Sequence, residues 1–268
     1  MVDGRPGEDV PLGGMSLRTP ARVALFVTCL VDAMRPRIGF AALRALADAG
    51  CEVVVPEAQT CCGQPALNSG DRATATDFAR RNVAMLEAYD AVVIPSGSCA
   101  GTIRCHYPEL LADDPEWSVR AEAVAAKTWE ILAWLDARGW RPEGVTLPAK
   151  ATYHDSCSGL RELGIKAQPR RLLGAVDGLD LVPLAGEETC CGFGGTFCVK
   201  YPAISNAIAD EKAAAVEASG AGLLLAGDLG CLMNMAGKLH RRGSEVRAFH
   251  TIEVLAGMAD GPAIGEAQ

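Results

Sequence analysis

The chain has 268 residues, of which 49% are hydrophobic and 22% are charged, a composition typical of a folded globular protein rather than a disordered one. Its net charge of −8 argues against nucleic acid or an anionic membrane surface as the main partner. No apolar run approaches the roughly 20 residues that a membrane-spanning helix needs. The length allows one large domain or two of ordinary size.

Residues 1–20 are rich in glycine and proline and lack the apolar core of a signal peptide. We expect a disordered tail there, a second tail over residues 261–268 and, without an export signal, a cytoplasmic protein. Thiols stay reduced in the cytoplasm. The eleven cysteines therefore indicate metal or redox chemistry rather than a disulfide framework.

The first half of the chain alternates short apolar runs with amphipathic segments. The pattern predicts strands at 22–28, 51–55 and 90–95 and helices at 38–49, 71–89 and 117–135. One or two cysteines follow each strand: Cys29 follows the first, Cys61-Cys62 the second and Cys99 the third.

The second half repeats this order. Strands are predicted at 151–154, 179–184, 222–226 and 245–250, with helices at 203–219 and 251–258. Cysteines again follow the first three strands, at Cys157, Cys190-Cys191 and Cys231. Residues 128–133 (TWEILA) also match 251–256 (TIEVLA), which extends the repeat.

These observations predict a duplicated α/β unit with mostly parallel sheets flanked by helices. We expect one domain over residues 21–140 and another over 150–260, joined by a linker at 138–150 that is rich in glycine and proline. In such sheets ligands gather at the carboxyl ends of the strands. The four cysteines of each half are therefore expected to share one crevice, as a first and a second site.

Thiolates are soft ligands that select zinc, cuprous copper or iron–sulfur clusters. Structural zinc usually uses compact C-x₂-C hooks, which neither half contains. Adjacent cysteines suit a larger group better, because their diverging side chains can each bind a different metal atom. The spacing thus favours an iron–sulfur cluster. A zinc-binding structural or assembly protein and a thiol-disulfide oxidoreductase using the vicinal pairs remain alternatives.

Other candidates are less specific. His154 and Asp155 lie just before Cys157, where they could support a ligand or move a proton, or simply belong to the core. The glycine-rich run 192–195 could donate backbone N–H groups to cluster sulfurs, or form only a tight turn. Cys51 is expected in the core, and Cys105 and Cys198 are open as extra ligands.

The doubled pattern C-x₃₁₋₃₂-C-C-G-x₃₅₋₃₈-C resembles the cysteine-rich CCG-domain family, which includes the B subunit of heterodisulfide reductase. The resemblance is greatest to the lactate-utilization members of that family. It is carried by residues 26–29 (FVTC), 57–70 (EAQTCCGQPALNSG) and 190–197 (CCGFGGTF), and it covers about residues 21–259. It implies two Rossmann-like CCG domains.

The resemblance also implies a function. This would be an iron–sulfur electron-transfer subunit of a complex that oxidises L-lactate to pyruvate, with activity depending on a ferredoxin-type iron–sulfur subunit and a third small subunit. It implies up to one 4Fe–4S cluster per repeat, whereas catalytic residues stay unknown. A further C-x₂-C cysteine of heterodisulfide reductase is replaced here by Thr102 and Asn234. The ligands carried over are Cys29, Cys61, Cys62, Cys99, Cys157, Cys190, Cys191 and Cys231.

Overall fold

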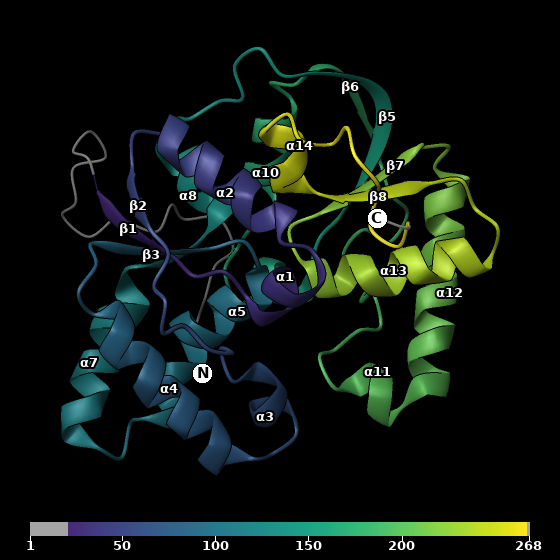
Figure 1. Cartoon of the computed structure of the whole chain (residues 1–268). Coiled ribbons are helices and arrows are strands. Elements are labelled where there is room, and N and C mark those ends of the chain that lie inside the picture. Colours follow the sequence, from purple (N-terminus) through teal and green to yellow (C-terminus); the bar gives the residue numbers. More distant parts are fainter. Residues whose placement is uncertain (1–20, 267–268) are drawn as a thin grey trace.

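Two four-stranded, all-parallel sheets form the framework of the protein, and helices flank both (Figure 1). The computed structural model describes residues 21–266, so the tail predicted over residues 1–20 lies outside the described residues. Within the described part, no helix is long and apolar enough to cross a membrane. The prediction of a duplicated α/β unit is confirmed.

The two sheets have the same topology, with strand orders β2-β1-β3-β4 and β6-β5-β7-β8. In each half the second strand lies at the edge, and the first, third and fourth strands follow across the sheet. The strands are β1 (Arg22–Leu25), β2 (Glu52–Val54), β3 (Ala91–Ile94), β4 (Thr128–Glu130), β5 (Thr146–His154), β6 (Asp177–Val182), β7 (Leu223–Ala226) and β8 (Arg247–His250).

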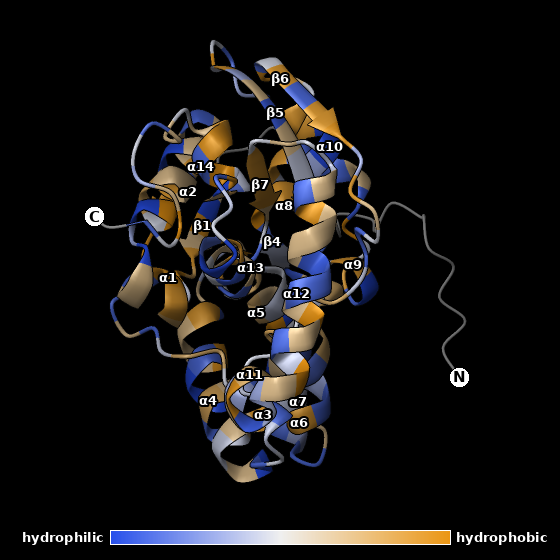
Figure 2. Cartoon of the chain, turned by 90° about the vertical axis from the view of Figure 1, so that its right-hand side faces the viewer, coloured by the Kyte–Doolittle hydropathy of each residue, from blue (hydrophilic) through white to orange (hydrophobic). Residues whose placement is uncertain are grey.

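Apolar spacing explains the elements locally. All four residues of β3 and of β7 are buried, as expected for central strands covered on both faces. Figure 2 shows β7 in hydrophobic colours at the centre, whereas α12 on the outside alternates between hydrophobic and hydrophilic residues. The helix α2 buries Ile38, Ala42 and Leu46 along one face and ends before Gly50, which takes the left-handed conformation at φ 76°.

The helices comprise several short segments and five of twelve or more residues. They are α1 (Cys29–Met34), α2 (Arg37–Asp48), α3 (Gln64–Asn68), α4 (Arg72–Leu86), α5 (Gly97–Gly101), the π-helix η1 (Thr102–His106), α6 (Tyr107–Leu110), α7 (Pro115–Ala126), α8 (Ile131–Ala137), α9 (Cys157–Arg161), α10 (Ala167–Leu173), α11 (Phe197–Lys200), α12 (Pro202–Ala218), α13 (Leu229–Arg241) and α14 (Thr251–Leu255).

The halves pack through reciprocal helix pairs. The helix α2 of the first half lies on α14 of the second, and α10 of the second lies on α8 of the first. In the same way, α5 contacts α9 and α1 contacts α13. Gly97 permits the α5–α9 contact, since a Cβ there would lie 3.0 Å from the Cα of Gly159. The helices that follow the cysteine-bearing strand ends thus meet at the centre of the molecule.

Two predicted elements differ from the structure. The prediction of one continuous helix over residues 117–135 is wrong, because β4 separates α7 from α8 and completes the first sheet. The strand expected at 151–154 is longer, since β5 already begins at Thr146, inside the segment predicted as a linker. Its first five residues alternate between exposed and half-buried, and therefore carry little of the apolar signal of a core strand.

The sequence match between residues 128–133 and 251–256 is offset from the structural equivalence. Pairing in the sheets aligns Ile94 with Glu130 and Ala226 with His250, so Glu130 and His250 occupy the same place. Both cap the helix that follows, α8 or α14, by accepting a backbone N–H two residues ahead. Ala133, not Glu130, is therefore the counterpart of Glu253.

The segment 261–266, which the sequence analysis assigned to a tail, contains no helix or strand but packs on the second half. Ala263 and Ile264 are buried, and the Ile264 N–H donates to the carbonyl of Ala248 on β8. Arg35 also donates to the carbonyl of Pro262. This segment therefore covers one side of the interface between the halves.

Candidate metal centres

Every one of the eight cysteines lies just beyond the carboxyl end of a strand. Cys29 and Cys157 begin α1 and α9, after β1 and β5. Cys99 and Cys231 are the third residues of α5 and α13, after β3 and β7. The two Cys-Cys-Gly steps lie in the loops after β2 and β6. Because all strands are parallel, these positions meet at one edge of each sheet.

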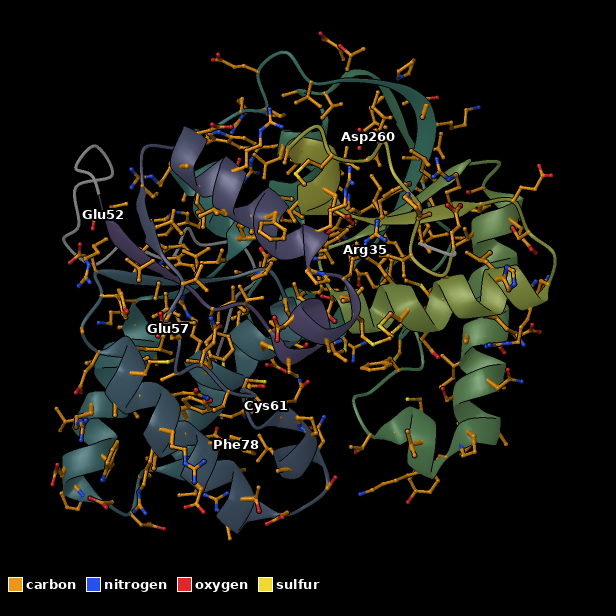
Figure 3. All side chains as sticks on the ribbon, in the orientation of Figure 1. Arg35, Glu52, Glu57, Cys61, Phe78 and Asp260 are labelled. Carbon is orange, nitrogen blue, oxygen red and sulfur yellow. The ribbon has the colours of Figure 1, made fainter. Side chains whose placement is uncertain are left out.

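The first site gathers Cys29, Cys61, Cys62 and Cys99. The thiol of Cys29 lies 3.9 Å from the Sγ of Cys61, and the Sγ atoms of Cys62 and Cys99 are 3.3 Å apart. Cys62 and Cys99 are buried, Cys61 is half-buried and Cys29 is exposed. Figure 3 shows Cys61 beside α3, toward the centre of the molecule. The site is thus closed on its inner side and open on its outer side.

The second site gathers Cys157, Cys190, Cys191 and Cys231 in the same way. Contacts link Cys157 with Cys190, and Cys191 with both Cys190 and Cys231. Cys191 and Cys231 are buried, whereas Cys157 and Cys190 are half-buried. The structure therefore places all eight predicted cysteines into two four-sulfur groups of the same design.

The glycine of each Cys-Cys-Gly step shapes the site through its backbone. Gly63 and Gly192 have φ angles of 86° and 84°, a left-handed conformation that favours glycine. The N–H of Gly63 donates to the Sγ of Cys61 at 3.4 Å, and that of Gly192 to the Sγ of Cys190 at 3.3 Å. A Cβ on Gly192 would also lie 2.7 Å from the carbonyl oxygen of Ser205. Another residue at this position would disturb both the turn and the N–H···S bond.

The four thiols of a site cannot all ionise unaided. Hydrogen bonds from Cys29, Cys62 and the Gly63 N–H hold the pKa of Cys61 well below its usual range. Contact with that sulfur, together with burial, raises the pKa of Cys29 and of Cys62. The second site shows the same division, with the pKa of Cys190 lowered and that of Cys191 raised. Four thiolates would therefore need a multivalent cation, as expected for a metal centre.

The backbone of the first Cys-Cys step is held by Asn82 and Tyr107. The Asn82 amide donates to the carbonyl of Cys61 at 3.0 Å and to the Tyr107 hydroxyl at 2.8 Å. That hydroxyl donates in turn to the carbonyl of Cys62 at 2.8 Å. Both side chains are buried. This network orients the carbonyls of the step without using its sulfurs.

Different residues surround the second Cys-Cys step. The Asn234 amide donates to the carbonyl of Cys191 at 2.8 Å. Lys212, only 3% exposed, donates to the carbonyls of Gly186 and Glu187, at 2.5 and 3.4 Å. Burial lowers the pKa of Lys212, and the nearby cysteines only partly offset this shift. A buried cation therefore adjoins the second site.

His154 also lies at the second site. It is fully buried, and neither ring nitrogen has a hydrogen-bond partner. Burial lowers its pKa to about 3, while the facing backbone carbonyl of Glu187 acts in the opposite direction, so the ring is neutral at ordinary pH. One nitrogen of His154 and the sulfurs of Cys191 and Cys231 all lie within 4.8 Å of one another.

The remaining cysteines lie apart from the sulfur contacts of both sites. Cys51 packs at the margin of the core. The thiol of Cys105 lies 4.0 Å from the carbonyl of Glu162, and that of Cys198 donates to the carbonyl of Gly195 at 3.5 Å. In the glycine-rich run, Phe193 packs against Gly230, where a Cβ would lie 2.5 Å from its ring.

The two sites are joined across the interface. Asp228, the N-cap of α13, accepts hydrogen bonds from the Ser96 hydroxyl and the Ser98 N–H, both at 3.0 Å. Ser96 caps α5, the helix that carries Cys99. On another side, the hydroxyls of Ser69 and Thr196 lie 3.3 Å apart and link the loops after the two Cys-Cys-Gly steps. The sites are thus fixed relative to each other.

Comparison with known proteins agrees with this arrangement. The model of a cysteine-rich domain, CCG, matches residues 23–104 and 151–236, which contain all eight cysteines. The chain belongs to the CCG cysteine-rich family. Each CCG domain supplies one sheet edge and four sulfurs.

Among curated relatives, lactate utilization protein A from an Exiguobacterium strain is 49% identical over 236 residues, covering 87% of this chain and 96% of the relative. The protein of that name from Bacillus subtilis is 45% identical over 235 residues, covering 87% and 98%.

Among solved structures, a hypothetical protein from Helicobacter pylori superposes with a TM-score of 0.65 over 91% of this chain, at 12% identity. The chain spans half the length of that protein. At this level of identity the similarity concerns the fold alone, and it agrees with the duplicated α/β arrangement of the two CCG domains.

Sequence reasoning missed the residues that helices bring to the sites, namely Asn82, Tyr107 and Lys212. A signal was present for two of them. Asn82 shares the buried face of α4 with Ala75, Ala79 and Val83, and Lys212 lies next to the buried Ala213 on α12. A polar residue on an otherwise apolar helix face indicates a buried partner.

Proposed function

We propose that this chain is an iron–sulfur, electron-transferring subunit of a cytoplasmic system that oxidises L-lactate to pyruvate. Its partners in this proposal are a ferredoxin-type iron–sulfur subunit and a third small subunit. The observation that carries the proposal is the pair of four-thiol groups, one at the strand ends of each half. The names of the similar proteins, which refer to lactate utilization, supply the metabolic context.

The donor set supports a cluster at each site. Four sulfurs converge, and no carboxylate is among them, which matches the soft ligands of iron–sulfur centres. The Gly63 and Gly192 N–H groups donate to sulfur, a contact that stabilises negative charge on ligand thiolates. The adjacent cysteines of each step differ in burial, so they face different sides of the bound group.

Under this proposal the ligands are Cys29, Cys61, Cys62 and Cys99 in the first site, and Cys157, Cys190, Cys191 and Cys231 in the second. A bound 4Fe–4S cluster would supply one-electron redox chemistry. The protein itself holds the sulfurs in place, buries the inner pair of each site away from water and leaves the outer pair toward solvent. An exposed outer side offers a route for electrons to a partner subunit.

Anaerobic purification with quantified iron, acid-labile sulfide and zinc tests this proposal. We expect iron and sulfide in equal amounts, enough for up to two clusters per chain, and an electron paramagnetic resonance signal in one oxidation state. Stoichiometric zinc without sulfide would instead support the structural zinc alternative. Metal-free protein whose Cys61-Cys62 pair cycles between dithiol and disulfide would support the oxidoreductase alternative.

The lactate assignment needs a separate test. A strain that lacks this gene and every other lactate oxidase should fail to grow on L-lactate and recover when the gene is restored. Normal growth of the deletion strain would refute the assignment while leaving the metal content of the protein unaffected.

A further inference from the structure

One buried side chain at the second site is left without a hydrogen bond. His154 is the last residue of β5, and both of its ring nitrogens lack a hydrogen-bond partner although the residue is fully buried. Buried polar groups are nearly always satisfied, because an unpaired one costs about 1–3 kcal/mol. An ordinary core histidine would therefore have at least one partner here.

The position of the ring suggests what satisfies it. Among residues 21–266, His154, Cys191 and Cys231 form the one group of at least three histidine, cysteine or acidic side chains whose ligand atoms all lie within 4.8 Å of one another. Cys191 and Cys231 form the buried inner pair of the second site. An imidazole nitrogen at this distance from two thiolates suits a shared metal atom.

We propose that His154 is a fifth protein ligand of the second site and binds, through one neutral ring nitrogen, the same metal centre as Cys191 and Cys231. This inference rests on the proposed function, since it concerns the group that the cysteines hold. The nitrogen would donate a lone pair to iron in a bound cluster, with no proton or electron transferred. The other nitrogen remains on the side of the Glu187 backbone carbonyl, which faces the ring.

The first site offers an internal control. Phe26 follows β1 at the position that His154 has on β5, and each lies three residues before the first cysteine of its site. The residue before each pairs with the central strand of its sheet, Leu25 with Val93 and Tyr153 with Leu225. The Phe26 N–H continues this ladder by donating to the carbonyl of Val93. Phenylalanine has no donor atom. The duplication therefore retained four cysteines at both sites but placed a nitrogen ligand at the second alone. The two centres should differ in ligand type, not only in environment.

Pulsed electron paramagnetic resonance on the anaerobically purified full chain tests the inference. Protein labelled with ¹⁵N-histidine should show hyperfine coupling from a directly bonded ¹⁵N nucleus, absent from protein without the label. The coupling should persist in Cys62→Ser protein, which retains the second site, and disappear in Cys191→Ser protein. His154→Gln should also abolish it, whereas His240→Gln, which changes an exposed histidine, should not.

The outcomes separate the two proposals. Labelled protein with full iron and sulfide but no ¹⁵N coupling overturns the histidine ligand and leaves the proposed function intact. Coupling that survives in folded His154→Gln or in Cys191→Ser protein also overturns it. Stoichiometric zinc without sulfide overturns both proposals. Because the labelled wild-type protein and the cysteine variants leave His154 unchanged, the test does not depend on the folding of His154→Gln.

Discussion

The two halves contain the same sulfurs in different surroundings. Residue eleven of α4 is Asn82 and residue eleven of α12 is Lys212, so a neutral amide at the first site corresponds to a cation at the second. Both side chains are buried. A second difference is that the apolar Phe26 of the first half corresponds to the polar, neutral His154 of the second. Duplication therefore preserved the four cysteines of each site and changed the polar groups around them.

This difference has an electrostatic consequence. A buried cation stabilises negative charge nearby more strongly than a solvent-exposed one, because the local dielectric response is weaker. Lys212 favours the more negative, reduced state of whatever the second site holds, whereas the amide of Asn82 supplies only a dipole. We therefore expect the second site to accept electrons at a higher potential than the first.

The largest effect should follow from removing one inner cysteine. Cys62→Ser or Cys191→Ser each removes a buried ligand from one site, so each should lower bound iron by about half, since metal affinity depends on the full set of thiolates. Iron and sulfide analysis after anaerobic purification measures this. Cys51→Ser, at the margin of the core, should keep the full amount. A loss of all iron in either single variant would show that the two sites are loaded as one unit.

The second prediction concerns the interface between the halves. The Nε atom of Arg35 donates to both carboxylate oxygens of Glu253, at 3.0 and 3.1 Å, and both residues are buried (Figure 3 shows Arg35 between the halves). In the first half, Ala133 occupies the position equivalent to Glu253, so this position carries no carboxylate there. Arg35→Met leaves a buried carboxylate without its cation and should cost about 3–5 kcal/mol of unfolding free energy in urea.

An exposed ion pair is the matched control for that measurement. Arg120 binds Glu87 at 2.9 Å on the surface, so Arg120→Met should change the unfolding free energy far less than Arg35→Met does. The double change of Arg35→Met with Glu253→Gln should recover part of the loss, because the uncompensated charge is then absent. Equal costs for the buried and exposed pairs would contradict the asymmetric interface.

Much of the fold could be predicted because the signals were local. The apolar runs at β1, β3 and β7 are short and largely buried, and each ends a few residues before a cysteine of a site, namely Cys29, Cys99 or Cys231. Parallel strands end at a common edge, so the convergence of cysteines far apart in the sequence followed from topology. That these sulfurs bind metal remains a prediction.

The missed features depend on tertiary register. The strand β4 is only three residues long and continues the helix-like apolar spacing on either side, so periodicity alone could not separate it. Asn82 on α4 and Lys212 on α12 lie about twenty residues after each Cys-Cys step, and only the packing of these helices determines which helix residue reaches the loop that carries the step. His154 was a candidate, but its lack of partners is visible only in three dimensions.

The third prediction tests the charge difference directly. Lys212→Met keeps an unbranched side chain one heavy atom shorter and removes the charge, which should lower the potential of the second site. A unit charge roughly 8 Å away under an effective dielectric constant near 20 contributes on the order of 2 kcal/mol, or about 90 mV for a one-electron couple. A redox titration followed by electron paramagnetic resonance measures the shift. Lys166→Met, which removes an exposed lysine paired with Glu187, should shift it far less. Equal shifts would refute a special role for Lys212.

The smallest effect concerns Glu130, the counterpart of His250. Burial raises the pKa of Glu130 to about 8, and the nearby Asp228 carboxylate adds to this. One carboxylate oxygen of Glu130 has no hydrogen-bond partner. Between the ordinary value of 4.5 and about 8, the folded protein keeps this proton while the unfolded chain loses it. Stability should therefore fall as pH rises through this window, by at most about 1.4 kcal/mol per pH unit.

Glu130→Gln should remove this contribution to the slope, as measured by urea unfolding of metal-free wild type and variant between about pH 7 and 8. Burial lowers the pKa of His250 to about 4 and of His154 to about 3, so both rings lose their proton on folding and add a slope of opposite sign that fades above the ordinary value of 6.5. That contribution is the same in wild type and variant, so the difference between their slopes reports Glu130. Glu122→Gln, which changes an exposed carboxyl group on α7, should leave the slope as in the wild type. If Glu130→Gln also keeps that slope, Glu130 is ionised in the folded protein like an ordinary glutamate. The caps of the two halves would then differ in charge, a carboxylate in the first and a neutral imidazole in the second.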